Sequence, residues 1–271
     1  MHDTFNIFGL EIPAWGSMVS LGVLGLIGVM FYFFYKYNFS DKKIDTLVIL
    51  IATCGMVMYV SAAFFDALWH NIDVWRETGE FKWEWWGITF SGGLVGGIIC
   101  YFILFFIFFK KERYNIFFYL DLTITGVTLT HAFGRIGCFL GGCCYGGETS
   151  SWLGVNYPVG TYFKGGEIVT IYENVYPTQL FEAAFLFILF IVLFFFIKKN
   201  QLRYYLVSYG VFRFLLEYLR GDSRGASFLS FLSPSQFLSV LMIILGIVLF
   251  IFGDRIVNWL KKKYNPELLE A

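Results

Sequence analysis

The sequence predicts an all-α polytopic membrane protein with about seven transmembrane helices in a single domain, residues 1–271. Of its residues, 58% are hydrophobic and only 15% are charged, and the mean hydropathy is +0.66, as in membrane proteins. The formal net charge is zero, so no basic excess indicates a nucleic-acid partner. About 20 apolar residues cross a bilayer core, and seven runs come near that length. They cover residues 16–35, 45–68, 87–109, 115–133, 178–197, 203–219 and 234–252.

The basic residues predict the orientation of these helices. Most of the 20 Lys and Arg residues follow the first, third, fifth and seventh runs, and Lys and Arg accumulate in cytoplasmic loops. The N-terminus is therefore predicted outside and the C-terminus in the cytoplasm. The N-terminal residues 1–15 contain no Lys or Arg, unlike a cleaved signal peptide, so the first run is expected to be a retained span.

Two segments on the predicted outer side are too long for simple turns. Residues 69–86 include the aromatic stretch 81–86, which is typical of an interfacial belt that anchors helix ends. Residues 134–176 combine Gly and polar residues with several Tyr and one Trp. We expect this second segment to fold into a small extracytoplasmic cap.

The third run begins with Ser91, Gly92 and Gly93, followed by two further glycines. Small residues at this density allow helices to pack closely, or allow the backbone to line a cavity. The sequence leaves both alternatives open.

The fourth run ends in residues 131–147, which contain one His, one Arg, three Cys and six Gly. An arginine in a membrane needs an anionic partner or a water-filled cavity, so Arg135 indicates a site for a negatively charged ligand. His131 precedes Arg135 by four residues, which places both on one helix face.

Arg213 and Glu217 show the same spacing in the sixth run, and Arg220 follows them. An Arg–Glu pair of this kind can be a structural ion pair within the membrane. Alternatively, several arginines close together suit phosphate, because the guanidinium group can donate two parallel hydrogen bonds to its oxygens.

The fifth run begins with Pro177, which suits the first turn of a helix. Gln179 and Glu182 follow at i and i+3. They are either a polar helix start or hydrogen-bonding partners of a lipid head group or an ordered loop.

Three of the five cysteines, Cys138, Cys143 and Cys144, are clustered after the fourth run. They can be small packing residues, a disulfide pair with one remaining thiol, or a site with a nucleophilic thiol. Zinc is a weaker alternative, because the spacing C-x4-C-C is not a usual ligand motif and lacks a His pair.

Five segments, in order along the chain, resemble the prolipoprotein diacylglyceryl transferase family: residues 12–16, 92–93, 134–137, 177–182 and 209–217. The resemblance implies transfer of the diacylglyceryl group of phosphatidylglycerol to the lipobox cysteine thiol of a prolipoprotein, with release of glycerol phosphate. It also implies a bacterial cytoplasmic (inner) membrane, an active site facing the outer leaflet, and no metal or organic cofactor. The partners are then the lipid, the signal-peptide and lipobox segment of the prolipoprotein, and the bilayer.

The resemblance also assigns roles to residues. Arg135 matches a head-group ligand, Arg213 a second essential arginine and Glu217 its acidic partner. Fixed arginines can stabilise the charge that grows on the departing phosphate. The candidates for catalysis are therefore Arg135, Arg213, His131 and Glu217, and those for substrate binding are Arg135, Ser91, Gly92, Gly93, Cys138, Cys143, Gln179, Glu182 and Arg220.

Four positions depart from the family pattern. Cys138 replaces an asparagine, Cys143 replaces a glutamate, Ser91 replaces the histidine before Gly-Gly, and Trp15 stands where a tyrosine is expected. Serine is a poor general base at neutral pH, whereas histidine titrates near neutrality. We therefore hypothesise that His131 supplies the missing base.

These departures leave two other functions open. One is a related membrane transferase that moves a lipid or head group to another acceptor, and the other is a non-catalytic lipid-binding homologue. A transporter is expected to show internal repeats, and the sequence shows none.

Overall fold

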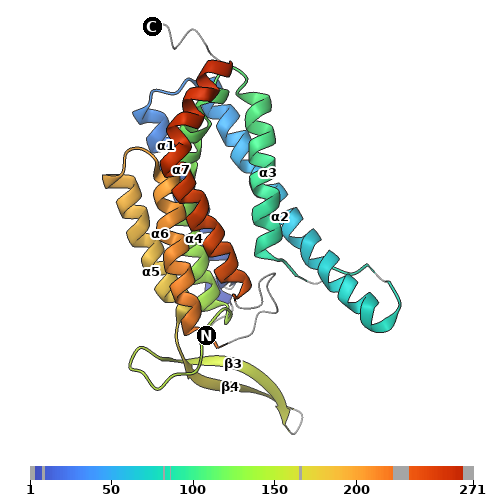
Figure 1. Cartoon of the computed structure of the whole chain (residues 1–271). Helices are drawn as coiled ribbons and strands as arrows, with labels where there is room; N and C mark the ends of the chain where they lie inside the picture. Colours follow the sequence, from blue (N-terminus) through green and yellow to red (C-terminus); the bar gives the residue numbers. More distant parts are fainter. Residues whose placement is uncertain are drawn as a thin grey trace. The chain divides into compact units, whose positions relative to one another are not determined.

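The computed structural model describes residues 4–7, 10–81, 83–85, 87–164, 167–221 and 232–264. Within these residues, seven α-helices follow one another in the order of the seven predicted runs (Figure 1). They are α1 Ala14–Lys36, α2 Asp41–Thr78, α3 Phe90–Phe108, α4 Ile116–Leu140, α5 Thr178–Ile191, α6 Gln201–Leu216 and α7 Pro234–Tyr264.

Five of these helices, α1, α2, α4, α5 and α7, are long and apolar enough to cross a membrane. A π-helical turn, η2 (Val192–Phe196), extends α5. The helix α3 is apolar but shorter, and α6 has 16 residues. The prediction of a helical membrane protein is thereby confirmed at the level of fold class.

Three helices, α2, α4 and α7, continue well beyond the apolar runs predicted for them, and α7 reaches Tyr264, 12 residues past the run that ends at residue 252. The helix α2 runs ten residues beyond the predicted end at residue 68, into the segment expected to be a loop. It ends at Gly79, whose φ of 75° is left-handed and whose N–H donates to the Trp75 carbonyl, a typical glycine C-cap. The helix α4 continues through Gly134 and Gly137, and the chain turns only at Gly142, with φ 73°.

The described residues form two compact units. Unit 1 contains residues up to Phe33 together with Phe117–Asn258, and unit 2 contains Phe34–Ile116 and the residues from Trp259 onward. Each unit is described by itself.

In unit 1, α1 packs closely against α4 through glycine. A Cβ atom at Gly22 would lie 2.9 Å from the Thr130 Cα, so only glycine allows this approach. The Thr130 hydroxyl donates to the Gly22 carbonyl (2.9 Å), which links the two helices at the same point.

The hydrophobic core of unit 1 joins α4 to α5, α6 and α7. Gly210 allows α6 and α7 to approach closely, because a Cβ atom at this position would lie 3.0 Å from the Ser239 carbonyl of α7. The buried residues of this core are Ala132, Leu186, Leu189, Leu193, Tyr205, Leu206, Tyr209 and Leu249.

Asp121, an acid in the fourth predicted run, has a structural role. Its carboxylate accepts the backbone N–H groups of Asn200 (2.8 Å) and Leu202 (2.9 Å). These donors belong to the first turn of α6 and have no partner within the helix. Asp121 therefore caps α6 from another helix.

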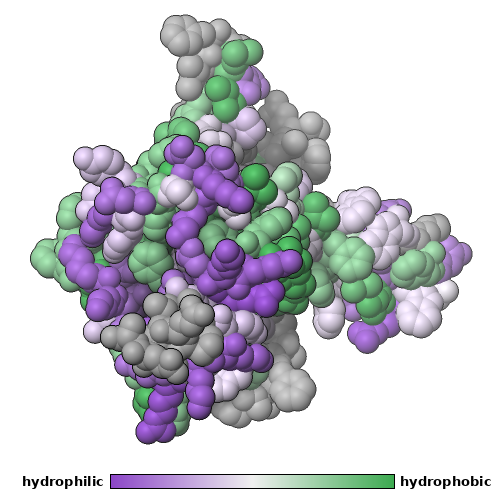
Figure 2. Space-filling model, turned by 90° about the horizontal axis from the view of Figure 1, so that it is seen from above, coloured by the Kyte–Doolittle hydropathy of each residue, from purple (hydrophilic) through white to green (hydrophobic). Residues whose placement is uncertain are grey.

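The end of unit 1 formed by the α5–α6 connection and the adjoining turns of α7 is polar, with Lys198, Lys199, Asp254 and Arg255. Hydrophilic side chains gather on this face in the view from above (Figure 2).

Two β-hairpins complete unit 1. The strands β1 (Thr4–Ile7) and β2 (Leu10–Pro13) pair antiparallel, which the sequence analysis did not predict. The strands β3 (Val155–Lys164) and β4 (Glu167–Val175) form the second hairpin, at the end of the bundle where α4 ends and α5 begins (Figure 1). The predicted cap contains this hairpin.

In unit 2, α3 packs against α2 along its glycines. A Cβ atom at Gly92 would lie 2.5 Å from that of Phe65, and one at Gly93 would lie 3.0 Å from the Met58 carbonyl. The loop after α2 is held by Asn71, whose side chain exchanges hydrogen bonds with the Glu84 backbone (2.8 and 3.0 Å).

Candidate active site

Three helices of unit 1 converge on the carboxylate of Glu182, which is 1% exposed. Its Oε1 lies 3.0 Å from Arg135 Nε and 3.7 Å from His131 Nε2, both on α4. The Tyr209 hydroxyl of α6 donates to the same oxygen (2.6 Å), and the His131 and Tyr209 rings meet edge to face, with centroids 5.1 Å apart. The predicted shared helix face of His131 and Arg135 thus points at one acid.

A second ion pair lies at the end of α6 and is linked by hydrogen bonds to the start of α7. Arg213 Nη1 lies 2.8 Å from Glu217 Oε2, and Arg213 Nη2 donates to the Ser235 hydroxyl (2.9 Å). The Ser233 hydroxyl donates to Glu217 Oε1 (2.8 Å). Glu217 begins the short helix η3 (Glu217–Leu219), so the pair lies at the end of α6.

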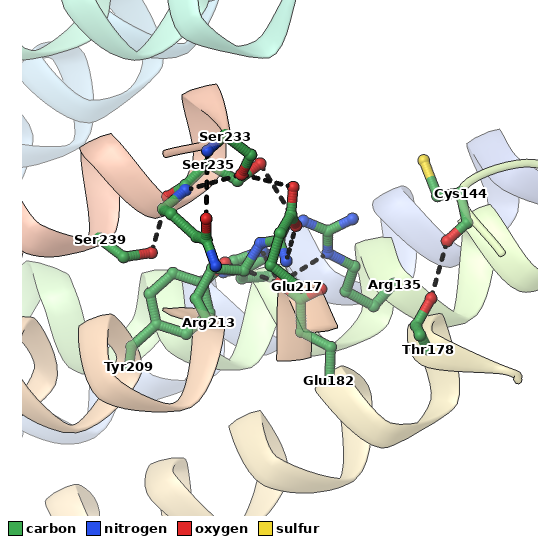
Figure 3. A network of polar contacts seen from close by, with 12 residues as sticks. Arg135, Cys144, Thr178, Glu182, Tyr209, Arg213, Glu217, Ser233, Ser235 and Ser239 are labelled. Atoms are coloured by element: carbon green, nitrogen blue, oxygen red, sulfur yellow. Dashed lines mark hydrogen bonds and ion pairs between the residues drawn. The ribbon is translucent and has the colours of Figure 1, made fainter. Parts of the chain in front are cut away.

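The two ion pairs belong to one polar network (Figure 3). Arg213 lies within electrostatic range of both Glu182 and His131. Two guanidinium groups therefore face two carboxylates, and the charges of these four side chains cancel. Mutual neutralisation of this kind is how buried charges are tolerated in a membrane protein.

The arginine side chains of this network have more N–H donors than their carboxylate partners use, so they can also bind an anion. Guanidinium groups carry five N–H donors in a planar fork, and Arg135 contacts Glu182 through Nε. A guanidinium group that meets a carboxylate through Nε still has the donors of its terminal nitrogens to offer to a further acceptor. The network combines this fork with Arg213 and with the imidazole of His131.

Beside Arg135, the three clustered cysteines bring their sulfur atoms together. The Sγ atoms of Cys138, Cys143 and Cys144 all lie within 4.8 Å of one another. All three are thiols in this structure, and Cys143 is exposed. Hydrogen bonding with the Cys138 and Cys144 thiols, followed by burial, raises the pKa of the Cys143 thiol above its ordinary value.

Side chains from α5 and β3 fix the backbone that carries these cysteines. Gln179 donates to the Cys143 carbonyl (2.5 Å) and Thr178 to the Cys144 carbonyl (3.0 Å). Tyr157 donates to the Phe139 carbonyl (2.8 Å) and accepts from Gln179 (3.1 Å). Burial raises the pKa of the Tyr157 hydroxyl, so it stays a donor. Gln179 thus contacts an ordered loop, one of its two predicted alternatives.

The remaining predicted site residues are Ser91, Gly92, Gly93 and Arg220. Ser91, Gly92 and Gly93 begin α3 in unit 2, and both glycines face α2, as close helix packing requires. Arg220 follows η3, where its N–H donates to the Glu217 carbonyl (3.1 Å). Asp222 and Arg224, which follow Arg220 in the sequence, lie outside the described residues. The substrate-binding roles of Ser91, Gly92, Gly93 and Arg220 stay predictions.

Sequence reasoning missed Tyr209, Ser233 and Ser235. Tyr209 stands four residues before Arg213, the spacing that places two residues on one helix face, so this signal was present. Ser233 begins a capping box: its hydroxyl accepts the Gln236 N–H, and its own N–H donates to Gln236 Oε1 (both 3.1 Å). The S-P-S-Q sequence is a recognisable helix start, but its contact with Glu217 is tertiary.

Comparison with known proteins identifies relatives along nearly the whole chain. The model of the prolipoprotein diacylglyceryl transferase family matches residues 2–252. A phosphatidylglycerol–prolipoprotein diacylglyceryl transferase of Clostridium tetani is 31% identical, over 91% of this chain and 95% of the relative. A protein of the same name from Campylobacter lari is 33% identical, over 90% of each chain.

Proposed function

Because the chain belongs to the prolipoprotein diacylglyceryl transferase family, we propose that it transfers the diacylglyceryl group of phosphatidylglycerol to the lipobox cysteine thiol of prolipoproteins. The reaction takes place in the bacterial cytoplasmic membrane, with the active site facing the outer leaflet. The observation that carries the proposal is the pair of largely buried arginines, Arg135 and Arg213, each held by a carboxylate.

Arg135 and Arg213 bind the phosphate of the lipid head group. A phosphodiester offers two charged oxygens, and a guanidinium fork matches them in a plane. Glu182 and Glu217 hold the two guanidinium groups in place before the lipid arrives, so little reorganisation is needed as the reaction proceeds. Preorganised donors of this kind stabilise charge that grows in the transition state.

The reaction creates negative charge and releases one proton. The thiolate sulfur attacks the glyceryl carbon, a C–S bond forms, and the C–O bond to phosphate breaks with its electron pair on oxygen. The phosphodiester monoanion becomes a phosphomonoester that can carry a second charge, while the thiol proton must leave. His131 takes this proton, and Glu182, 3.7 Å away, stabilises the imidazolium that results.

The other candidate residues position the catalytic groups or bind the substrates. Gln179 and Glu182 position the loop and Arg135, and Glu217 positions Arg213. Cys138 and Cys143 lie next to Arg135 along the chain, where the acceptor thiol must meet the glyceryl carbon. Arg220 contacts the remainder of the lipid or the lipobox segment.

Expression in a bacterium depleted of its own transferase tests this function. We expect the chain to restore thioether-linked diacylglycerol on a model lipoprotein, measured by mass spectrometry. A variant with Arg135→Ala should be inserted in the membrane but inactive. If the wild-type protein is membrane-inserted and stable but forms no thioether, another acceptor or a non-catalytic lipid-binding role replaces the proposal.

A further inference from the structure

We propose that Cys138 and Cys143 form a disulfide bond that closes the C-terminal end of α4, while Cys144 keeps its thiol. The bond begins three residues after Arg135 along the chain. This inference rests on the proposed function only for the compartment, because thiols outside the cytoplasm meet an oxidising environment. The choice of the two cysteines stands on the structure of the helix end.

The helix α4 ends in a Schellman motif, in which the chain folds back over the last helical turn. Gly142 has a φ of 73°, the left-handed conformation that this motif requires. The Cys143 N–H donates to the Cys138 carbonyl (3.1 Å), which is the long hydrogen bond of the motif. Cys138 and Cys143 therefore occupy the two positions whose side chains characteristically contact each other in such a helix end.

The two side chains follow this arrangement of the backbone. Cys143 Sγ is turned back towards the last turn of α4, where it lies 3.6 Å from the Cys138 carbonyl oxygen. The Sγ atoms of Cys138, Cys143 and Cys144 all lie within 4.8 Å of one another. A disulfide needs sulfur atoms about 2 Å apart on closely spaced backbones. Because the hydrogen bond already holds the two backbones together, rotation of the two side chains closes the remaining gap.

Cys144 is the poorer partner for either of the other two cysteines. The cap places Cys143, and not Cys144, opposite Cys138. The Cα atoms of adjacent residues are about 3.8 Å apart, less than the roughly 4.4–6.8 Å that disulfides usually span, so Cys143 and Cys144 pair only with strain. The backbone of Cys144 is also fixed by Thr178 of α5, whose hydroxyl donates to its carbonyl (3.0 Å; Figure 3).

The disulfide strengthens the part of α4 that carries Arg135. Gln179 donates to the Cys143 carbonyl (2.5 Å), and Tyr157 donates to the Phe139 carbonyl (2.8 Å). These hydrogen bonds hold the helix end from outside, but helix ends open more easily than helix centres. A covalent bond across the cap opposes this opening, which would otherwise displace the Arg135 guanidinium.

Formation of the bond is a two-electron oxidation, and the oxidant is a second disulfide, carried by a thiol–disulfide oxidoreductase or by a small molecule. Cys143 is exposed, so its thiolate attacks the oxidant, forms a mixed disulfide and releases one thiol. Cys138 then attacks the Cys143 sulfur and releases the second thiol. The two protons lost by the cysteines end on the two sulfur atoms of the oxidant.

The finished bond is a lasting one and not a rapid switch. Hydrogen bonding with the neighbouring thiols, followed by burial, raises the pKa of the Cys143 thiol. A thiol with a raised pKa attacks slowly at neutral pH, but it is also a poor leaving group. Reduction of the bond at this sulfur atom is therefore slow as well.

Differential labelling of the full-length protein in growing cells tests the bond. Acid precipitation stops thiol exchange, a light maleimide blocks the thiols, and a heavy maleimide labels the cysteines that appear after reduction. We expect heavy label on Cys138 and Cys143 and light label on Cys144. Cys54 and Cys100, on α2 and α3, are internal controls and should carry the light label. Light label on Cys138 and Cys143 would overturn the proposal.

Single variants identify the two partners. Peptide mapping of the purified protein without reductant should find the bond in the parent protein and in Cys144→Ser. Cys138→Ser and Cys143→Ser should each lose it. A bond between Cys144 and either of the other two cysteines in the parent protein would overturn the assignment.

The melting temperature in detergent shows whether the bond stabilises the fold. A disulfide restricts the unfolded chain, so reduction should lower the melting temperature of the parent protein by about 5 °C. Cys144→Ser should show the same shift, whereas Cys143→Ser, which cannot form the bond, should show none. Equal responses of the parent protein and Cys143→Ser to the reductant would refute a stabilising role.

The proposed function is tested separately, by transferase activity on the same preparation. An active protein in which all three cysteines are thiols would refute the disulfide alone. A protein that contains the disulfide but forms no thioether would refute the proposed function and leave the disulfide standing.

Discussion

Arg135, Arg213 and Arg203 offer a comparison at the scale of single residues. Each is a largely buried arginine paired with a carboxylate, but Arg203 pairs with Asp254 (2.9 Å) at the polar end of unit 1. Replacement by Lys keeps the charge and removes the planar fork. We expect Arg135→Lys and Arg213→Lys to lower the transfer rate by about 100-fold or more. Arg203→Lys should change it little.

A reconstituted assay with labelled phosphatidylglycerol and a lipobox peptide measures this difference. Expression levels and melting temperatures of the three variants should be compared first, since Arg135→Lys and Arg213→Lys each leave a largely buried carboxylate with a poorer partner, whereas Asp254, the partner of Arg203, is exposed. Equal losses of activity in all three would argue that the arginines act through stability alone.

His131 is the proposed acceptor of the thiol proton. His131→Gln retains hydrogen bonding but cannot accept the thiol proton, so we expect kcat to fall by about 100-fold and KM for the lipid to change little. A general base must be unprotonated, so the wild-type rate should fall towards acid pH. The variant should lose this acid limb, which a purely structural role for His131 would not affect.

The residues of the site differ in how far their contacts follow from the sequence. The pairing of Arg213 with Glu217 follows from the i, i+4 spacing, because both are on one helix. The pairing of Arg135 with Glu182 spans two helices and depends on their packing. The sequence therefore indicated which charged residues matter, whereas the contact of Glu182 with Arg135 appears only when α4 and α5 pack together. The substrate-binding role of Glu182 stays a prediction.

Among the helices, α1 has two glycines in different surroundings: Gly22 packs against α4, whereas the Cβ position of Gly28 is open. A Cβ atom at Gly22 would meet the Thr130 backbone at 2.9 Å, whereas one at Gly28 would meet nothing within 4 Å. Gly22→Ala should destabilise the protein by about 1–3 kcal/mol. Gly28→Ala, the matched control, should be neutral or stabilising because alanine favours the helix. Melting temperatures in detergent measure both, and equal shifts would contradict the α1–α4 contact.

The start of α7 links helix stability to the site. Ser233 caps the helix and also donates to Glu217, so Ser233→Ala should cost about 1 kcal/mol and should also raise KM for phosphatidylglycerol by loosening Glu217 and Arg213. Ser239→Ala is the control, since this hydroxyl donates within α7 to the Ser235 carbonyl. A loss of stability with an unchanged KM would mean that the cap does not position the ion pair.

The positions of the helices were predictable to within a few residues where an apolar run ends in polar or glycine-rich sequence. The ends of α2, α4 and α7 were not, because hydropathy marks where an apolar run ends, whereas a helix continues until a residue such as Gly79 after α2 or Gly142 after α4 stops it. The hairpin of β1 and β2 escaped prediction because its strands are only four residues long.

At the scale of the whole molecule, the charge bias predicts an orientation that can be measured. Trp152, before the β3–β4 hairpin, is 89% exposed and is predicted outside, whereas Lys199, in the α5–α6 connection, is predicted in the cytoplasm. In intact cells, a membrane-impermeant thiol reagent should label Trp152→Cys above the background of the parent protein. Lys199→Cys should be labelled only after lysis, and the opposite pattern would place the Arg135 end of unit 1 in the cytoplasm, where the proposed lipoprotein substrate is not acylated.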